Sequence, residues 1–295
     1  MEDDGDNRTE IGQRVLTRRR LLFGLGGCVG AAAGALFYAK RIEPHWLEVV
    51  SREMALRGLP AALEGCSLIQ LSDLHVGPQV EDEYVLETFA RVAQLRPDIV
   101  VVTGDWMSYR DDHEIRQLER LLKSFPHGRL ATLGILGNHD YGPNWSVEAV
   151  GDSVSDLASA AGITMLRNES VLVEGLVFVG LDDYWGPRFD PEPVLAAVQG
   201  RAAAVCLCHN PDVADEKVWG KFRGWILSGH THGGQCKPPF LPPPLLPVRN
   251  RTYSAGAFTL DRRRTLYVNR GVGHLLQARF NVRPEVTVFA LTGRA

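Results

Sequence analysis

The chain alternates short apolar runs with segments in which apolar residues recur every three or four positions. The run at residues 98–103, DIVVVT, is typical of a strand that is buried on both faces. Val85, Phe89 and Val92 have the spacing of one helix face. The same patterns predict strands at residues 67–71, 130–136, 171–173, 176–181, 203–208, 224–227, 265–268 and 285–291, and helices near 115–122 and 147–157. Strands alternate with helices in the first half of the pattern, and the second half is rich in strands. This order indicates a layered α/β fold.

The N-terminal part carries a different pattern. Arg18, Arg19 and Arg20 precede an apolar stretch, residues 21–39, that is rich in glycine and alanine. Paired arginines before a moderately hydrophobic stretch resemble a twin-arginine export signal, although about 20 apolar residues also suffice for a plain membrane anchor. We therefore expect residues 1–41 to be a signal or anchor. We expect residues 42–295 to form a separate domain outside the cytoplasm, held at the membrane or released from it.

Composition narrows the class of protein. Residues 42–295 hold 25 Lys and Arg against 30 Asp and Glu, and a mildly acidic body argues against nucleic-acid binding. The five cysteines include no CxxC pair; Cys206 and Cys208 alternate along an apolar run, which favours small buried strand residues over a redox site. Residues 237–248 hold six prolines and are predicted to form a stiff, exposed apolar loop that walls a substrate or faces a membrane. No pattern indicates an oligomeric state.

Polar side chains follow five of the predicted strands at the point where each strand ends. Ligands of α/β sheets bind outside the carboxyl ends of the strands, so we expect these side chains to meet at one edge. Five of the nine histidines fall at these positions, which argues against incidental turn or core residues. The residues are Asp73, His75, Asp105, Asn138, His139, Asp140, His209, and the pair His230 and His232 in GHTHGGQ.

These residue types suit two divalent metal ions. Carboxylate, imidazole and carboxamide ligands without thiolate favour Mn²⁺, Fe²⁺ or Zn²⁺. Two ions with Asp73 and Asp105 as anionic ligands leave a positive site that attracts a phosphate ester, and such a centre supplies hydroxide near neutral pH. Asp105, central in the order, is the candidate bridging ligand. His139 is the candidate general acid for the leaving group, and Asp140 is placed to orient it.

The blocks SDLH, GDW, GNHD, CHNP and GHTHGG, in this order between residues 67 and 235, resemble the calcineurin-like metallophosphoesterase family. The resemblance implies a four-layer α/β/β/α sandwich of two mixed sheets with a dinuclear site at the strand ends. His139 matches the substrate-facing histidine of the family. The resemblance also implies two ligand sets: Asp73, His75, Asp105 and His232 for one ion, and Asp105, Asn138, His209 and His230 for the other.

The C-terminal blocks YSAG, YVNRGVG and RPEVT extend the resemblance to bacterial membrane-anchored or exported phosphodiesterases. They are also similar to enzymes that split UDP-2,3-diacylglucosamine in lipid A synthesis. The Asp-Arg-Gly block of protein phosphatases does not follow Gly104 and Asp105, which argues against that class.

The expected function is therefore a metal-dependent phosphodiesterase or pyrophosphatase in which a metal-bridging hydroxide attacks phosphorus in line. The expected substrate is a small-molecule or lipid-linked phosphoester of the membrane or cell envelope. The first alternative is a UDP-2,3-diacylglucosamine pyrophosphate hydrolase, for which an export signal would place the site on the wrong side of the membrane. The second alternative is a non-catalytic metal-binding protein.

Overall fold

The computed structural model describes residues 29–201 and 203–293. The chain divides into two compact units, Met1–Tyr38 and Ala39–Ala295. Residues 29–37 of the first unit are helical, whereas Arg18, Arg19, Arg20 and residues 21–28 of the apolar stretch lie outside the described residues. Among the described residues, no helix combines the length and apolarity that a membrane crossing requires. The predicted boundary between residues 41 and 42 stays a prediction.

The described strands of the second unit form two mixed sheets of six strands each. In the first sheet, β12 is parallel to β1 and antiparallel to β2, and the strands from β2 to β5 run parallel. Its core strand β3 is buried at all five positions, as expected for a strand covered on both faces. The order is β1 (Glu48–Ala55), β12 (Glu285–Thr292), β2 (Ser67–Leu71), β3 (Ile99–Thr103), β4 (Ala131–Ile135), β5 (Thr164–Met165).

The second sheet has a parallel centre and antiparallel edges. Strands β7, β8, β9 and β11 run parallel, while β6 and β10 pair antiparallel to their neighbours. The order across this sheet is β10 (Gly256–Thr259), β11 (Arg264–Val268), β9 (Gly224–Ser228), β8 (Ala204–Leu207), β7 (Leu176–Gly180), β6 (Glu169–Val173). The parallel strands of each sheet bring several carboxyl ends to a common edge, which is the condition for the predicted site.

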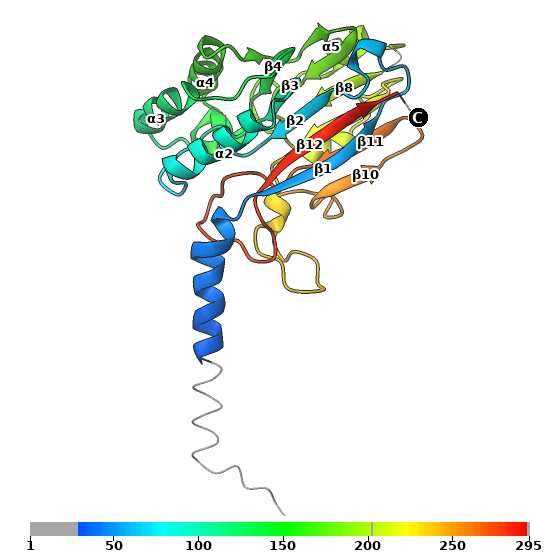
Figure 1. The fold of residues 1–295 in the computed structure, drawn as a ribbon. Coiled ribbons are helices and arrows are strands. Elements are labelled where there is room, and N and C mark those ends of the chain that lie inside the picture. Colours follow the sequence, from blue (N-terminus) through cyan, green and yellow to red (C-terminus); the bar gives the residue numbers. More distant parts are fainter. Residues whose placement is uncertain (1–28, 202, 294–295) are drawn as a thin grey trace, which may run out of the picture. The chain divides into compact units, whose positions relative to one another are not determined.

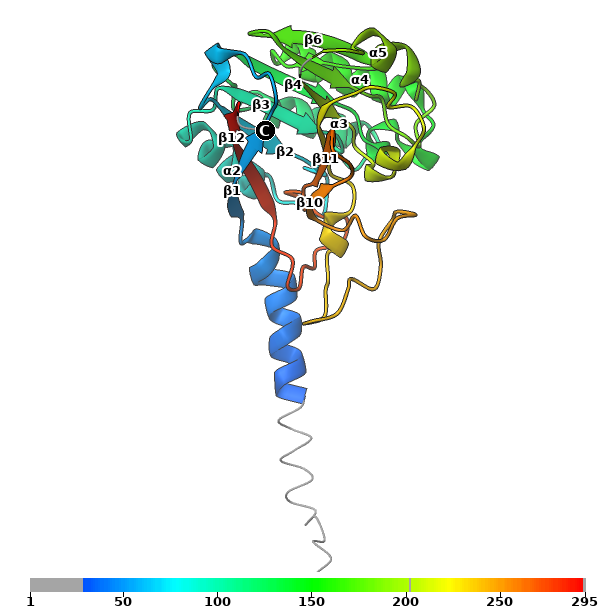
Figure 2. The ribbon, with the colours of Figure 1, turned by 90° about the vertical axis from the view of Figure 1, so that its right-hand side faces the viewer.

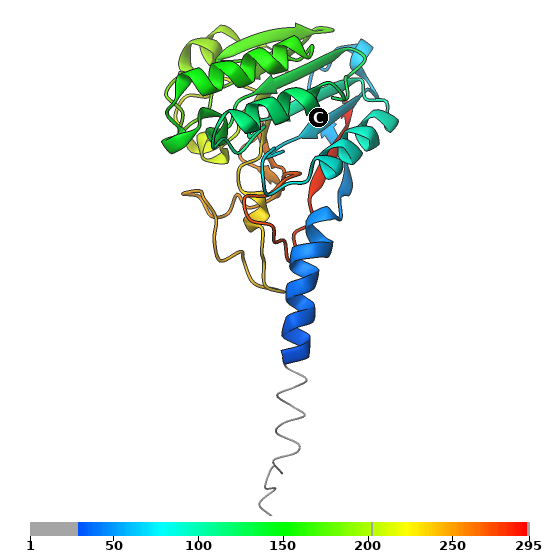
Figure 3. The same ribbon diagram turned by 90° about the vertical axis from the view of Figure 1, so that its left-hand side faces the viewer.

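Three apolar cores separate four layers (Figure 1). Helices α2 (Asp82–Gln94), α3 (Asp112–Leu122) and α4 (Glu148–Ala160) cover the outer face of the first sheet, and Figure 3 shows them side by side. The second core lies between the sheets, and α5 (Glu192–Ala197) packs on the outer face of the second sheet. The layered α/β fold with two mixed sheets is thus confirmed.

Short helical turns occupy several loops and positions near the strand ends. They are η1 (Tyr38–Ile42), η2 (Glu43–His45), η3 (Ala61–Leu63), η4 (Asn138–Tyr141), η5 (Pro143–Trp145), η6 (Pro211–Asp215) and η7 (His232–Gly234). The proline-rich segment at residues 237–248 contains no described helix or strand, in agreement with the loop expected from its prolines.

Candidate metal centre

Seven buried polar side chains follow the ends of five strands from the two sheets, and six of them come together in two groups. Each candidate comes from the first few residues after its strand, where the parallel ladder stops and the backbone is free to turn. The first sheet contributes Asp73 and His75 after β2, Asp105 after β3 and Asn138 after β4, and the second contributes His209 after β8 and His230 and His232 after β9.

Asp73, His75 and His232 form the first group able to hold a metal ion. The Nε2 atoms of His75 and His232 lie 2.9 Å apart, and Oδ1 of Asp73 lies 3.4 Å from Nε2 of His232. The Asp73 carboxylate also accepts a hydrogen bond of 3.0 Å from the backbone N–H of His230. This bond joins the end of β2 in one sheet to the end of β9 in the other.

Asp105, His209 and His230 form the second group able to hold a metal ion. Nε2 of His209 lies 3.1 Å from Oδ2 of Asp105 and 3.2 Å from Nδ1 of His230. The same Oδ2 of Asp105 lies 3.5 Å from Nε2 of His75, which belongs to the first group. Asp105 therefore lies between the two groups, where a ligand shared by two ions would have to be.

The backbone is strained at most of these positions. The φ angles of Asp73, His75, Asp105, His230 and His232 are 52°, 48°, 55°, 71° and 49°. Left-handed conformations of residues other than glycine cost about 1–3 kcal/mol each and collect at functional sites, because the surrounding structure must hold them. The strain at five ligand candidates favours a site shaped for function over a set of ordinary polar turns.

Outer hydrogen bonds orient the imidazoles. Nδ1 of His75 lies 2.9 Å from Oγ of Ser108, and Nδ1 of His209 lies 2.7 Å from the carbonyl oxygen of Thr103. A carbonyl accepts only a donated proton, so His209 carries its proton on Nδ1 and directs Nε2 at the cluster. Partners of this kind fix the ring plane and the tautomer that a metal ligand needs.

Burial governs the protonation of the histidines and carboxylates. Burial holds the pKa of His75 and of His232 well below the ordinary value, so both rings are neutral and keep a lone pair. Burial also raises the pKa of Asp73 to about 6. For His209, burial lowers the pKa, but the Asp105 carboxylate outweighs this effect and raises the pKa to about 10. His209 is therefore protonated without a metal, and a divalent cation that binds there would displace that proton, whereas His75 and His232 already offer a lone pair.

Asn138 supplies an independent test of whether a metal fits. Its side-chain oxygen, Oδ1, is buried and has no hydrogen-bond partner among the described residues. A buried polar atom without a partner costs free energy, so such atoms are rare unless a ligand satisfies them. An unpartnered carboxamide oxygen three residues after β4 is a ligand type that hard or borderline divalent ions accept.

His139 and Asp140 lie on η4, the turn after β4, and play different structural parts. The backbone N–H of His139 donates to Oδ1 of Asp105 at 2.9 Å, and its ring is half-buried, 5.1 Å from the ring of His75. The Asp140 carboxylate accepts from the backbone N–H groups of Gly137 and Met107, at 2.8 and 3.2 Å. Asp140 therefore holds the turn that presents His139, through the backbone.

Two tryptophans form a wall beside the centre. The rings of Trp145 and Trp185 stack with their centroids 4.8 Å apart, and Trp185 meets the ring of His230 edge-on at 4.6 Å. Trp145 is 6.4 Å from the ring of His139. The pair presents a flat apolar surface beside the rings of His139 and His230.

Sequence reasoning missed Asp183, which follows β7 at the same edge. Its carboxyl group is buried, Oδ1 has no hydrogen-bond partner among the described residues, and burial raises its pKa to about 7. The signal was present, because LDD follows an apolar strand as the other blocks do. No histidine or glycine is directly adjacent to Asp182 and Asp183, so the sequence does not distinguish this pair from ordinary turn residues.

Arg279 is a second missed residue near the site. It is fully buried and donates to the carbonyl oxygens of Arg270, Gly271 and Gly273, with Nη2 lying 3.4 Å from Nδ1 of His232. No sequence pattern indicates that Arg279 is buried while most arginines lie on the surface. Two other arginines form ion pairs with carboxylates: Arg188 with Glu148 and Arg270 with Glu285.

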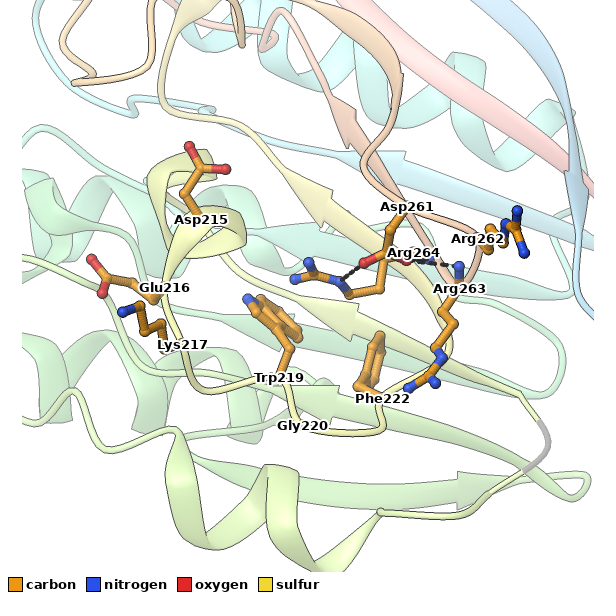
Figure 4. A pocket seen from close by; sticks show the side chains of 10 residues that line it. All are labelled: Asp215, Glu216, Lys217, Trp219, Gly220, Phe222, Asp261, Arg262, Arg263 and Arg264. Atoms are coloured by element: carbon orange, nitrogen blue, oxygen red, sulfur yellow. Dashed lines mark hydrogen bonds and ion pairs between the residues drawn. The ribbon is translucent and has the colours of Figure 1, made fainter.

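Two other chemical features are separate from the centre. Burial raises the pKa of the Cys206 and Cys208 thiols, which are inert core groups as expected. A hollow of about 610 Å³ lies by Trp219 and Phe222 (Figure 4), and it shares no residue with the two metal groups. One of its cations, Arg264, pairs with Asp261 at 2.9 Å. The hollow is therefore not part of the candidate metal site.

Comparison with known proteins shows the family. The calcineurin-like phosphoesterase model matches residues 67–234, more than half of the chain. The protein belongs to this family. The chain is 32% identical to the uncharacterized metallophosphoesterase YkuE of Bacillus subtilis. The match covers 94% of the chain and 98% of the relative.

Two further relatives have named activities. Phosphodiesterase YaeI of Escherichia coli is 28% identical over 94% of the chain and all of the relative. UDP-2,3-diacylglucosamine pyrophosphatase LpxG of Chlamydia trachomatis is 26% identical over 84% of the chain and 90% of the relative. The family match, with these phosphodiesterase and pyrophosphatase relatives, makes this calcineurin-like phosphoesterase a hydrolase of phosphoester bonds.

Proposed function

We propose that the protein is a two-metal phosphodiesterase or pyrophosphatase acting on a phosphoester of the membrane or cell envelope. One observation carries the proposal: two metal-competent groups lie side by side, with Oδ2 of Asp105 facing a histidine of each. We assign Asp73, His75, Asp105 and His232 to one ion and Asp105, Asn138, His209 and His230 to the other.

The charge of the ligand set selects the substrate. Asp73 and Asp105 carry two negative charges against four from two divalent ions, so the loaded site attracts a phosphate group. Two bound ions would polarise the phosphoryl oxygens and supply hydroxide near neutral pH. The protein adds a rigid, largely buried cradle in which these charges are weakly screened.

His139 is the proposed proton donor. No described residue hydrogen-bonds its ring nitrogens, so the ring is free to reach the leaving-group oxygen, and its backbone bond to Asp105 fixes its position. Asp140 holds the turn through Gly137 and Met107. The stacked rings of Trp145 and Trp185 would offer an apolar surface to the leaving group.

A UDP-2,3-diacylglucosamine pyrophosphatase is the second candidate, supported by the similarity to the chlamydial pyrophosphatase over most of both chains. Its substrate is likewise a phosphoester next to acyl chains. The N-terminal segment separates the candidates: an export signal at Arg18, Arg19 and Arg20 puts the domain outside the cytoplasm, where we propose that it acts. A retained membrane anchor with the domain in the cytoplasm would favour the UDP-2,3-diacylglucosamine pyrophosphatase.

The test is hydrolysis of a bis-aryl phosphate diester and of UDP-2,3-diacylglucosamine by the purified chain, with Mn²⁺, Zn²⁺ or EDTA. Asn138→Ala and His139→Ala serve as site controls. Metal-dependent cleavage of the diester alone supports the first candidate, and cleavage of the UDP-lipid supports the second. Metal bound at two ions per chain with neither substrate cleaved would overturn both and leave a metal-binding protein.

A further inference from the structure

Two loops beside the metal centre expose large apolar side chains. The proline-rich loop, residues 237–248, carries Phe240, Leu241 and Leu245, which are 104%, 59% and 79% exposed. The second loop, residues 271–282, carries Leu275 and Leu276, which are 40% and 71% exposed. Scattered apolar residues are normal on a surface, but five exposed ones on two loops that are hydrogen-bonded to each other favour a role in binding. We call these five side chains the two-loop surface.

The two loops are fastened to each other. Nε2 of Gln235 donates to the carbonyl oxygens of Leu276 and Ala278, at 2.6 and 2.9 Å. The backbone N–H of Lys237 donates to the carbonyl oxygen of Phe280 at 2.9 Å. The guanidinium of Arg251 donates two bonds of 3.0 Å to the carbonyls of Pro243 and Pro244. These bonds, with six prolines, hold the apolar side chains outward instead of letting them collapse inward.

The two-loop surface adjoins the residue at which the apolar stretch 21–39 ends. The backbone N–H of Arg279, on the second loop, donates to the carbonyl oxygen of Ala39 at 2.8 Å. Figures 2 and 3 show both loops at the end of the second unit where residues 39–45 lie. If the predicted anchor at residues 21–39 is retained, Ala39 is its last residue and would lie at the bilayer surface. The second loop, which is bonded to Ala39, and the proline-rich loop fastened to it would then lie near the same surface.

The charges around the patch complement an anionic surface. Residues 236–256 and 271–284 contain no Asp or Glu, whereas Lys40, Arg41 and Lys237 lie in or beside the bonded segments. Two carboxylates contact the second loop: Glu43, which is buried and accepts from the backbone N–H of Val282, and Glu81, which contacts Gln277 and His45, with 2.7 Å between Oε2 of Glu81 and Nε2 of His45. Exposed apolar side chains framed by cations are the composition of a segment that rests in the headgroup region of anionic lipid.

Each loop also contacts one histidine of the metal centre. The carbonyl oxygen of Pro247 lies 2.9 Å from Nε2 of His230, and Nη2 of Arg279 lies 3.4 Å from Nδ1 of His232. We propose that the two-loop surface docks in the interface of an anionic bilayer and sets the metal centre beside the lipid headgroups. The substrate class is then a lipid whose headgroup contains a phosphodiester or pyrophosphate, an extension that rests on the proposed function.

The docking is tested with the full chain on vesicles of phosphatidylglycerol and phosphatidylcholine that carry brominated acyl chains. Phe240→Trp places a reporter on the two-loop surface, and Leu172→Trp is the matched control, because Leu172 is 58% exposed on β6, a strand of the second sheet's far edge. After subtraction of the parent spectrum, the added tryptophan of F240W is expected to lose most of its fluorescence and that of L172W to keep it. Equal quenching of both, or none of F240W, would overturn the docking.

A second measurement separates the docking from the reaction. The triple variant F240S/L241S/L245S alters no residue of the metal centre, so cleavage of a soluble bis-aryl diester is expected to be unchanged. Cleavage of a phosphodiester headgroup in anionic vesicles is expected to fall at least about tenfold, because the substrate is no longer brought to the site. If the parent cleaves the soluble diester but no vesicle lipid, the substrate class fails while the quenching still decides the docking. If the parent cleaves neither, the proposed function fails.

Discussion

The backbone N–H of His139 donates a hydrogen bond of 2.9 Å to Oδ1 of Asp105, whose other oxygen faces histidines of both metal groups. The proposed proton donor is thus tied to the proposed shared ligand by a short, direct bond. The bond fixes the backbone of His139 relative to Asp105, so the ring of the proposed proton donor starts from a defined position beside the proposed shared ligand.

Replacing His139 by alanine is expected to lower kcat by about 10²–10⁴, the usual contribution of a positioned general acid. The backbone bond to Asp105 does not need the imidazole, so metal content is expected to stay at the parent level. Steady-state cleavage of a bis-aryl diester and elemental analysis measure the two quantities. His113→Ala, at an exposed histidine on α3, is the control and is expected to be silent. Loss of metal from His139→Ala would show that the residue is a ligand instead.

Gly229→Ala is expected to displace Asp73. A Cβ at this position would lie 1.9 Å from Oγ of Ser72 and 2.2 Å from Oδ2 of Asp73, closer than any real contact. We expect a destabilisation of about 1–3 kcal/mol, typical of overpacking, and the loss of one metal ion per chain. Urea unfolding and elemental analysis test this. At Gly293, in contrast, a Cβ meets only the Glu64 carboxylate, at 3.1 Å, so Gly293→Ala should change neither quantity.

Asp183→Asn is expected to stabilise the metal-free protein at alkaline pH. Burial raises the pKa of Asp183 to about 7, above the unfolded value of 3.8, so its contribution to stability is present at low pH and is lost as pH rises through 7. The asparagine does not ionise, and its advantage at pH 8 should reach at most about 4 kcal/mol and vanish below pH 4. Urea unfolding in EDTA at several pH values tests this. An advantage that is constant with pH would contradict it.

His274 is expected to destabilise the protein in acid. Burial lowers its pKa to about 4, below the ordinary 6.5, while Nε2 lies 2.7 Å from the carbonyl oxygen of Gln79. A depressed folded-state pKa gives stability that is present above pH 6.5 and is lost as pH falls toward 4. His274→Asn should remove up to about 3 kcal/mol of that pH dependence. The measurement is the difference in unfolding free energy between variant and parent at pH 7.5 and 4.5, with EDTA in both. A difference that does not change with pH would exclude His274.

The central strands were predictable from the sequence because they are buried on both faces. Residues 98–103 and 203–208 predicted β3 and β8, since continuous apolar runs bounded by glycine or polar residues have few other interpretations. The pattern did not reveal β1, where polar Ser51, Arg52 and Glu53 lie on an exposed edge paired only with β12. Nor did it reveal β5 or β10, of two and four residues, whose pairing depends on neighbours distant in the chain.

The candidate site was predictable at the level of residue types and chain order. Asp73, Asp105 and His209 each follow a strand, and parallel pairing within each sheet then brings neighbouring strand ends together. The sequence did not reveal which sheet each residue belongs to, or that the bond of Asp73 to His230 crosses between the sheets. Arg279 escaped notice because only the folded loop at residues 271–282 shows that its guanidinium is buried.

Both metal groups draw their members from the two sheets: Asp73 and His75 of the first group come from one sheet and His232 from the other. In the second group Asp105 comes from the first sheet, and His209 and His230 come from the second. Each bound ion would therefore link the two sheets. Its binding free energy would stabilise the packing of one sheet on the other. The availability of metal would then affect the stability of the folded protein as well as its catalytic activity.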